Sequence, residues 1–299
     1  NNMGVPGAKA THIAIQGYGF LNPFFKRMVD PSEVTTASIL SKASAQNPTF
    51  FSMFIGNNDV LAYALAGGAS DAITPSSAFD PSIDAIVNTM TANGAKGVIG
   101  NIPDVTSLPY FTTIPYNGLT LDATQAAQLS AAYAPLGITF KAGSNPFMIK
   151  DPAATGGMRQ IKSTEYVLLS TPQDSLKCFG YGSQNPLSNK YVLTEAEVSS
   201  IQVAVAGYNA KLNAVASSKG LAYVDVNGFM AKAKSGIVYN GINTSSTFVS
   251  GGAFSLDGVH LTPRANAMLA NEFIKAINST YGSTIPQVDA TKYNGVAFP

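Results

Sequence analysis

The sequence predicts an α/β fold with a parallel sheet, arranged as a single domain over 1–299 with a long insertion. Three apolar runs of strand length, at 49–55, 96–102 and 221–226, are separated by segments that carry helix signals. A connection between parallel strands needs about a dozen residues and usually contains a helix, so this alternation favours parallel pairing. The chain of 299 residues is long enough to bury a sizeable core.

The first strand is expected after two helical segments. A short helix is predicted within 8–15 and a longer one at 34–46, where Asn47-Pro48 ends it. The run from Thr49 to Ile55 is apolar and rich in aromatic residues, which suits a strand buried on both faces. It ends in the turn Gly56-Asn57-Asn58-Asp59, at the carboxyl end of the predicted strand.

A long irregular region interrupts the pattern after the second strand. The helix before that strand is predicted to begin at Asp80-Pro81, with an acceptor side chain at the N-cap and proline at the first helical position, and to end at Asn93-Gly94. Residues 103–190 are rich in Gly, Pro, Ser and Asn and are interpreted as an insertion or lid. Within it, only 122–134 suggests a helix and 165–169 a short strand.

Regular structure is expected again from Thr194. Glu197 follows this hydroxyl by three residues, which resembles a capping box and predicts a helix to about Ser218. A glycine-rich loop is predicted at 236–254, and a final helix at 263–281 before an extended tail. The inward face of that helix is expected to hold four apolar side chains: Leu269, Phe273, Ile274 and Ile277.

The composition excludes several classes of partner. Charged residues make up 12% of the chain, compared with roughly 25% in an average soluble protein. The 18 basic and 17 acidic residues are scattered without a run, so no nucleic acid or anionic membrane is expected as a partner. No apolar stretch approaches the ~20 residues that span a bilayer.

The chain lacks the residues of a typical metal centre, and no cofactor is expected. Cys178 is the only cysteine, which excludes an internal disulfide framework and a cysteine-rich zinc site. It is expected to be an inert, buried thiol. His12 is expected to be structural, because no carboxylate is paired with it in the sequence. The segment 225–228 resembles part of a calcium loop but is interpreted as a turn after a strand.

The segment Asp257-Gly258-Val259-His260 places an aspartate three residues before a histidine, just ahead of the final helix. In a tight loop, the carboxylate of Asp257 can accept a hydrogen bond from one ring nitrogen of His260. This fixes the tautomer, so that the other nitrogen can face a nucleophile. The alternative for the same spacing is an aspartate that caps the helix beside a solvent-facing histidine.

Asn58 and Gly7 are candidate donors to an oxyanion. The amide of Asn58 follows a predicted strand, and Gly7 offers a backbone N–H with no side chain in the way. The alternatives are a turn asparagine and an ordinary turn glycine. Ligands of open α/β sheets bind outside the carboxyl ends of the strands, where these segments are expected.

Three segments resemble conserved blocks of a known family. Asn2 to Gly7, Ile55 to Asp59 and Asp257 to His260 look like blocks two, three and five of the GDSL, or SGNH, hydrolases. These blocks span nearly the whole chain in the family's order. The resemblance implies a flavodoxin-like three-layer α/β/α sandwich. It also implies an acyl-enzyme mechanism that hydrolyses lipid, thioester, aryl or carbohydrate esters without a cofactor.

The resemblance also implies a role for each candidate residue. Gly7 and Asn58 are then the oxyanion donors, His260 the general base and acid, and Asp257 its orienting carboxylate. The family's first block, Gly-Asp-Ser with the nucleophilic serine, occurs nowhere in the 299 residues. Three explanations are open: an upstream segment that was cleaved or omitted, a separate polypeptide, or an inactive relative. The first two are favoured, with a first strand and helix missing together with the serine.

Segments that flank the blocks bear on location and substrate. Residues 48–52 and 251–255 resemble secreted or envelope lipases of Bacteroidetes-type bacteria, which implies a secreted, periplasmic or outer-membrane protein. The expected partners are a lipid, aryl or acylated-carbohydrate ester and the protein's own cleaved N-terminal segment. Aromatic residues at 109–111, 114–116 and 147–149 are interpreted either as an acyl-binding wall or as packing beneath a loop. The rival function is an inactive, SGNH-like surface protein that binds a glycan or lipid.

Overall fold

The computed structural model describes residues 1–296, and a three-stranded parallel sheet lies at its centre. The strands β1 (Phe50–Met53), β2 (Lys96–Gly100) and β9 (Ala222–Val224) lie in the order β1-β2-β9. The predicted α/β class and parallel pairing are therefore confirmed. Each strand is a few residues shorter than the apolar run that predicted it.

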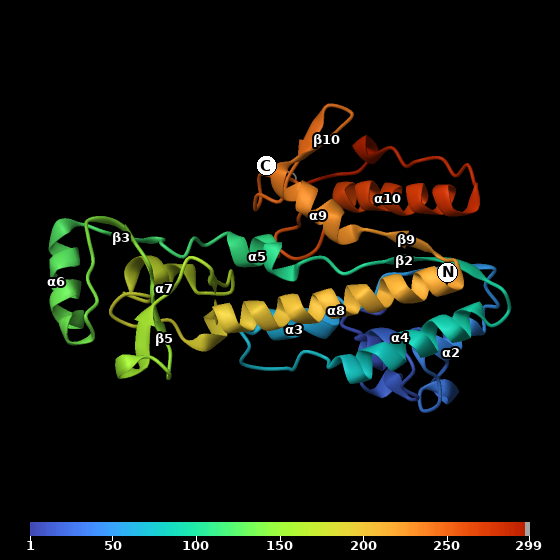
Figure 1. The fold of residues 1–299 in the computed structure, drawn as a ribbon, viewed down its shortest axis with the longest axis horizontal. Helices are drawn as coiled ribbons and strands as arrows, with labels where there is room; N and C mark the ends of the chain where they lie inside the picture. Colours follow the sequence, from blue (N-terminus) through green and yellow to red (C-terminus); the bar gives the residue numbers. More distant parts are fainter. Residues whose placement is uncertain (297–299) are drawn as a thin grey trace.

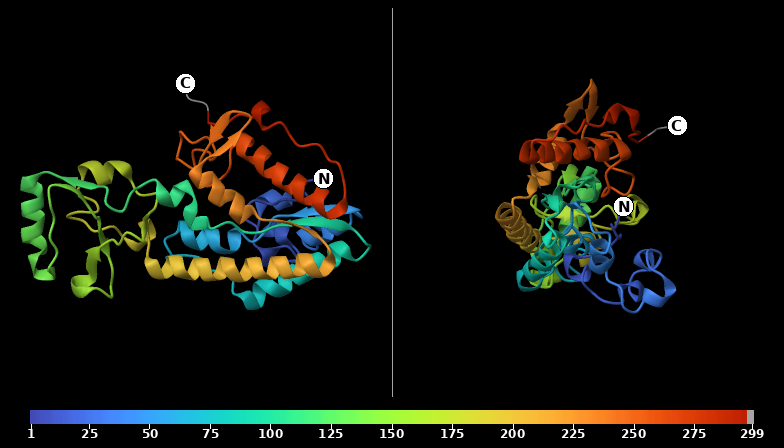
Figure 2. Two further views of the ribbon diagram at one scale, coloured as in Figure 1. Left: turned by 45° about the horizontal axis from the view of Figure 1, so that its top comes forward. Right: turned by 90° about the vertical axis from the view of Figure 1, so that its right-hand side faces the viewer.

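Helices cover both faces of this sheet (Figures 1 and 2). On one face lie α3 (Asn58–Leu65), α4 (Ser76–Thr91) and α8 (Glu195–Lys219), which pack against one another. On the other face α9 (Val226–Ser235) and α10 (Pro263–Tyr281) pack together, and α10 contacts β2 and β9. The described chain is thus a sheet between two helical layers.

The central strand β2 is buried from both sides. Val98 and Ile99 on this strand are fully buried and point to opposite faces of the sheet. On the α4 and α8 side, the ring of Phe79 stacks on that of Tyr208, with centroids 3.9 Å apart. Burying each of these large side chains contributes about 1.5–3 kcal/mol. The sheet is therefore held mainly by apolar packing on its middle strand.

The two longest helices, α8 and α10, begin where the sequence predicted. In α8, Glu197 Oε2 accepts hydrogen bonds from the backbone N–H of Thr194 at 2.6 Å and from its hydroxyl at 2.7 Å, and Gly220 closes the helix in the left-handed conformation. In α10, the Thr262 hydroxyl accepts from the N–H of Ala265. The boundaries of α10 match the prediction, but of its expected inward residues only Leu269 is fully buried, while the other three are half-buried.

Two helix boundaries differ from the prediction. Helix α4 begins at Ser76, so Asp80 and Pro81 lie inside it instead of at its start. Pro81 therefore costs the helix one backbone hydrogen bond, to the carbonyl of Ser77 four residues earlier. The helix predicted at 34–46 is confined to α2 (Ile39–Ser44), which Ser38 caps.

The predicted glycine-rich loop contains a hairpin. Strands β10 (Ile237–Tyr239) and β11 (Ile242–Thr244) pair antiparallel across Asn240 and Gly241, both of which have positive φ. A two-residue turn of this kind matches the twist of the strands, and Asn-Gly is its preferred sequence. The turn predicted at 225–228 is instead the start of helix α9, which Asp225 caps by accepting from the N–H of Gly228.

The insertion forms a second lobe with its own apolar core, seen at the left of Figure 1. Phe147, Met148 and Ile149 are buried in this core, and Phe111 is buried in the main one, so the interpretation as packing is confirmed for these side chains. The lobe and its approach contain α5 (Pro109–Thr112), β3 (Leu119–Leu121), α6 (Ala123–Tyr133), β4 (Gly143–Asn145), β5 (Met148–Lys150), β6 (Met158–Gln160), β7 (Tyr166–Val167), α7 (Gln173–Cys178) and β8 (Val192–Leu193).

The chain enters and leaves this lobe through one junction. β7 pairs with β8 at the exit, and Val167 of β7 also forms a bridge with Ile114 at the entry. Inside the lobe, Arg159 forms ion pairs with Asp151 at 2.6 Å and with the buried Glu165 at 2.7 Å. The expectation that Cys178 is buried is wrong: it ends the short helix α7 and is exposed to solvent.

Short helical turns occupy the rest of the described chain. The first half of the chain also contains α1 (Pro23–Lys26) and the 3-10 turns η1 (Ala10–His12), η2 (Tyr18–Phe20), η3 (Pro31–Glu33) and η4 (Val105–Ser107), and the second half contains η5 (Ala134–Leu136), η6 (Thr155–Gly157), η7 (Asn189–Tyr191) and η8 (Ala290–Lys292). The predicted tail is extended apart from η8, and its last three residues lie outside the described range. Within residues 1–296, no helix has the length and apolar character to cross a bilayer.

We expect Gly56→Ala to destabilise the chain strongly. Gly56 has φ of +109°, and a Cβ there would lie 2.4 Å from Cδ1 of the buried Ile102. Backbone strain and overpacking together should lower the free energy of unfolding by about 3 kcal/mol or more. Gly94→Ala is the matched control, because Gly94 has φ of +78° but open space around it, which leaves a cost of about 1 kcal/mol. Urea unfolding measures both, and equal losses would contradict the packing argument.

Candidate functional site

Asp257 and His260 form a hydrogen-bonded pair. The distance between Asp257 Oδ2 and His260 Nδ1 is 2.6 Å. The other carboxylate oxygen accepts from the backbone N–H of Val259 at 2.8 Å, from that of His260 at 2.9 Å and from the hydroxyl of Ser255 at 2.7 Å. Four donors thus fix the carboxylate, and the carboxylate fixes the orientation of the ring.

These hydrogen bonds determine the charge of Asp257. Partial burial raises the pKa of its carboxyl, but the hydrogen bonds from the His260 ring, the two backbone N–H groups and Ser255 together outweigh it and hold the pKa well below its usual range. Asp257 is therefore ionised at neutral pH. An ionised carboxylate at Nδ1 favours the tautomer with the proton on Nδ1 and stabilises a positive charge on the ring.

The second ring nitrogen of His260 is available for chemistry. The His260 side chain is 79% exposed, and its Nε2 makes no hydrogen bond with any residue in 1–296. The alternative in which Asp257 caps α10 is wrong, because Thr262 is the N-cap of that helix. The solvent-facing histidine of that alternative is what the structure contains. Because the hydrogen bond from Nδ1 to Asp257 fixes the ring, Nε2 of His260 faces the solvent.

The pair lies beyond the carboxyl ends of the strands. Tyr281, at the end of α10, donates its hydroxyl to the carbonyl of Gly97 near the start of β2, at 2.7 Å. Helix α10 therefore runs antiparallel to β2. Its first residues, and the loop before them, lie beyond the carboxyl ends of the strands. The loop is fixed by the N–H of Tyr110, which donates to the carbonyl of Gly258 at 3.0 Å, and the Tyr110 hydroxyl reaches the carbonyl of Leu65.

The structure also brings Asn58 and the Gly7 turn together. Asn58 is the first residue of α3, directly after β1, and its Nδ2 donates to the carbonyl of Ala8 at 3.0 Å. Gly7 is exposed, has φ of +74° and donates no backbone hydrogen bond within the described residues. The side-chain amide and the free N–H therefore lie on adjoining segments at the carboxyl end of β1.

A buried carboxylate anchors the Gly7 turn, and the sequence reasoning missed it. Asp59 is 1% exposed, and its Oδ2 accepts from the N–H of Ala10 at 2.8 Å. Burial raises the pKa of Asp59, and this backbone bond opposes the shift. The sequence signal that could have identified Asp59 is its place directly after Asn58, as an acidic residue at the start of a helix. His12 is structural as expected: its Nδ1 accepts from the N–H of Lys9 at 3.2 Å, and its partial burial lowers its pKa.

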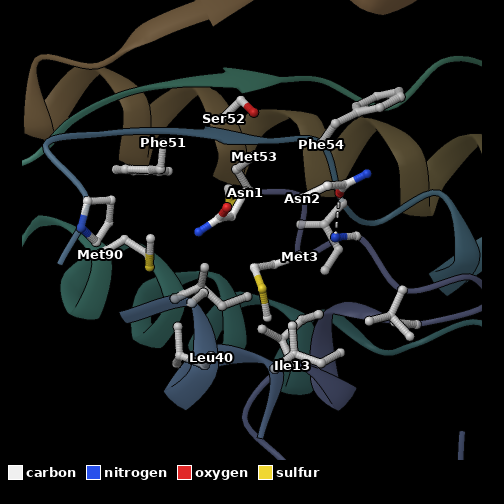
Figure 3. Close-up of a pocket in the computed structure, with 18 of the residues that line it drawn as sticks. Asn1, Asn2, Met3, Ile13, Leu40, Phe51, Ser52, Met53, Phe54 and Met90 are labelled. Carbon is white, nitrogen blue, oxygen red and sulfur yellow. Dashed lines mark hydrogen bonds between the residues drawn. The ribbon is translucent and has the colours of Figure 1, made fainter. Parts of the chain in front are cut away.

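A groove of about 1080 Å³ runs along the outer edge of β1 (Figure 3), and Asn58 is among the residues that line it. It follows the chain from Pro48 through β1 to the turn that carries Asn58. Leu40 and Met90 line its floor, and the segment 1–5 lies across from the strand. All side chains that line it are uncharged. The groove therefore connects an open strand edge with one half of the candidate site.

The structure does not join the Asp257–His260 pair directly to Asn58 and the Gly7 turn. Within residues 1–296, no hydrogen bond links His260 or Asp257 to Asn58 or Gly7, and no serine hydroxyl is bonded to the His260 ring. Ser255, the serine nearest in sequence, donates to the carboxylate instead. The described residues therefore hold a histidine oriented by a carboxylate and, apart from it, a side-chain amide beside a free backbone N–H, with no serine hydroxyl bonded to the ring.

The chain has neither a metal cluster in its described residues nor a match to known proteins that would assign the site. The described residues hold no group of three or more His, Cys, Asp and Glu side chains that could bind a metal ion. Comparison of the chain with protein-family models, with curated proteins and with solved structures gives no match. The site is thus described by its own geometry.

The low pKa of Asp257 makes a prediction for stability at acid pH. A carboxylate with a lower pKa in the folded than in the unfolded chain stabilises the fold fully above the unfolded value, about 3.9, and loses this contribution as the pH falls toward the folded value. The wild-type chain should therefore be more stable than Asp257→Asn at about pH 6, with the difference shrinking below about pH 4.

Urea unfolding across this pH range measures the difference. Asp174→Asn is the matched control, because the exposed Asp174 makes no hydrogen bond or ion pair within the described residues. It should leave the pH profile unchanged. A difference between wild type and Asp257→Asn that grows on acidification would contradict the assignment of Asp257 as an ionised acceptor.

Proposed function

We propose that this chain is the major part of a serine ester hydrolase of the SGNH type, with a flavodoxin-like α/β/α sandwich. The observation that carries the proposal is the 2.6 Å hydrogen bond between Asp257 Oδ2 and His260 Nδ1, with Nε2 of the same ring exposed and unpaired within residues 1–296. A histidine held in this way is prepared to take a proton from a hydroxyl nucleophile.

The proposed reaction is acyl transfer through a covalent intermediate. A serine oxygen attacks the ester carbonyl carbon, and its proton passes to Nε2 of His260. The bond to the leaving alcohol breaks, and His260 gives that alcohol its proton. Water then attacks the acyl-enzyme, with His260 taking a proton from the water and returning it to the serine as the acid leaves. Asp257 stays ionised and stabilises the ring's positive charge in both steps.

Asn58 and Gly7 are assigned to the oxyanion. Asn58 uses one Nδ2 hydrogen for the carbonyl of Ala8 and has a second to donate, and the N–H of Gly7 has no acceptor within the described residues. Donors in place before the reaction stabilise the negative charge of the tetrahedral intermediate without reorganisation. Asp59, which ties Ala10 to α3, positions this turn.

The nucleophile is proposed to come from a segment outside the chain described here, upstream of residue 1 or on a separate polypeptide. The hydroxyl of Ser255 is already hydrogen-bonded to Asp257. The proposed nucleophile is therefore a serine of another segment that reaches Nε2 of His260. We assign the substrate to lipid, aryl or acylated-carbohydrate esters and the protein to the bacterial envelope or exterior. The sparse charge of the chain is compatible with apolar esters.

The second candidate is a binding protein with the same fold and no turnover. It is favoured by one observation: no serine within residues 1–296 is bonded to His260. A surface protein of this kind would bind a glycan or lipid ester without cleaving it. The two candidates differ in whether a serine becomes covalently labelled.

Labelling with a fluorophosphonate probe tests the proposal. The natively produced protein is treated with the probe, and the modified peptide is mapped by mass spectrometry. We expect a labelled serine on a peptide that precedes or copurifies with this chain. The His260→Ala variant of the complete protein should lose the labelling, because the serine is then not activated. A folded protein that contains the upstream region and is not labelled would favour the binding protein.

The oxyanion assignment predicts a specific loss of rate. In the complete enzyme, Asn58→Ala should lower kcat by about 10² to 10³ with the fold intact. Asn57→Ala is the matched control, because the neighbouring Asn57 side chain makes no hydrogen bond at the helix start, and its rate should stay within about threefold. Ester hydrolysis and circular dichroism measure rate and fold. An Asn58→Ala enzyme with more than about a third of the wild-type rate would refute the role.

A further inference from the structure

The outer edge of β1 has backbone groups without partners. The N–H of Lys96 donates to the carbonyl of Thr49, on the side of β2. Successive residues of a strand turn their backbone groups to alternate edges, so the N–H and C=O groups of Phe50, Ser52 and Phe54 face the groove. No strand of the described chain pairs with this edge. Unpaired strand edges are rarely left open in this way.

The opposite wall of the groove is the segment of residues 1–5, and the contacts around it show that it runs in the same direction as β1. At its beginning, Nδ2 of Asn1 donates to Gln46, just before β1, and at its end the carbonyl of Ala8 accepts from Asn58, just after β1. Between these points, the segment forms no backbone hydrogen bond with the strand. A strand and a second segment that run in the same direction, with an open groove between them, match a parallel sheet that lacks one strand.

The groove is apolar above and below this gap. Met3, Ile13, Leu40 and Met90 gather on one side, as Figure 3 shows, together with Ile86. On the other side Phe50 is 39% and Phe54 is 44% exposed, and Ile277 of α10 lines the groove. An occupant must therefore be apolar on both faces, as buried parallel strands are. Because the lining is uncharged, a charged side chain inside the groove would be unpaired.

We propose that this groove accepts an extended apolar segment of about five residues as a further strand, parallel to β1, with its carboxyl end beside Asn58. The segment's N–H and C=O groups bond those of Phe50, Ser52 and Phe54. Its side chains fill the floor against Leu40 and cover the half-exposed aromatic rings. The identity of the residue at its carboxyl end, a serine, rests on the proposed function, whereas the position of the strand does not.

A peptide strand fits the groove better than an acyl chain. A hydrocarbon would cover the apolar floor but leave the outward N–H and C=O groups of β1 buried without partners. Each such group costs about 1–3 kcal/mol. A strand satisfies them and buries the same apolar surface, so the polar edge and the apolar floor select one occupant.

The probe is the synthetic peptide acetyl-Lys-Lys-Thr-Ile-Val-Val-Val-Gly-Ala-Ser-amide, added to the 299-residue chain. Its lysines stay outside the groove for solubility. Amide hydrogen exchange followed by mass spectrometry or NMR measures protection of residues 50–54, and titration measures affinity. The control peptide has proline in place of the central valine, which removes one N–H and one pairing position. We expect protection by the first peptide and at least tenfold weaker binding by the second.

Two variants of one residue test the edge itself. Ser52→Pro removes an N–H that faces the groove and leaves the pairing with β2 intact, since proline is accepted where the N–H points away from the sheet. Ser52→Ala keeps that N–H. Both chains should fold, as judged by circular dichroism and urea unfolding. We expect Ser52→Pro to bind the peptide at least tenfold more weakly and Ser52→Ala to bind within twofold of wild type.

Each outcome decides between named alternatives. Absence of protection, or equal binding of the proline peptide, overturns the strand. If sodium oleate fills the groove and excludes the peptide without protecting residues 50–54, the groove belongs to a lipid. Hydrolysis of p-nitrophenyl acetate by the peptide-bound chain is measured separately. A peptide that protects β1 but restores no hydrolysis leaves the strand in place and counts against the proposed function.

Discussion

The burial of β2 is the constraint on which the rest of the structure depends. Its side chains are enclosed by α4 and α8 on one face and by α10 on the other, and β1 and β9 take its two edges. The hydroxyl of Tyr281 adds a polar clamp, because it donates to the carbonyl of Gly97 and accepts from the N–H of Ala222. This arrangement fixes where each strand ends, and the loops that carry Asn58 and the Asp257–His260 pair follow from it.

Much of the fold could be predicted because local chemistry and packing agree. The Thr194 capping box and the proline at the start of α10 mark helix ends that tertiary contacts then keep. The prediction failed where packing competes with local signals. Asp80-Pro81 has the pattern of a helix start, but the helix extends back to Ser76, which brings Phe79 into the core. Asn240-Gly241 is a sequence typical of a hairpin turn, and the structure has a hairpin there where only a loop is predicted.

The candidate site was predictable in its parts. The three-residue spacing indicated that Asp257 can reach His260, since short-range geometry is contained in the sequence. The roles of Ser255 and Tyr110 were not predictable, because they depend on how the loop folds back and on what packs beside it. The contact between Asn58 and Ala8 joins residues 50 positions apart. Only the expected position of both segments at the carboxyl ends of strands indicated that they could meet.

The junction of the second lobe has a consequence for how such a protein can diversify. Ile114 at the entry and β8 at the exit both contact β7, so the lobe is attached to the sheet domain at one place. Its core contains none of the side chains that pack on β2. A unit attached in this way can change in length and sequence beyond the junction while the sheet keeps its core, provided that α5 stays, because Tyr110 holds the carbonyl of Gly258 beside the Asp257–His260 pair. The lobe and the sheet domain can therefore change in sequence at different rates within one chain.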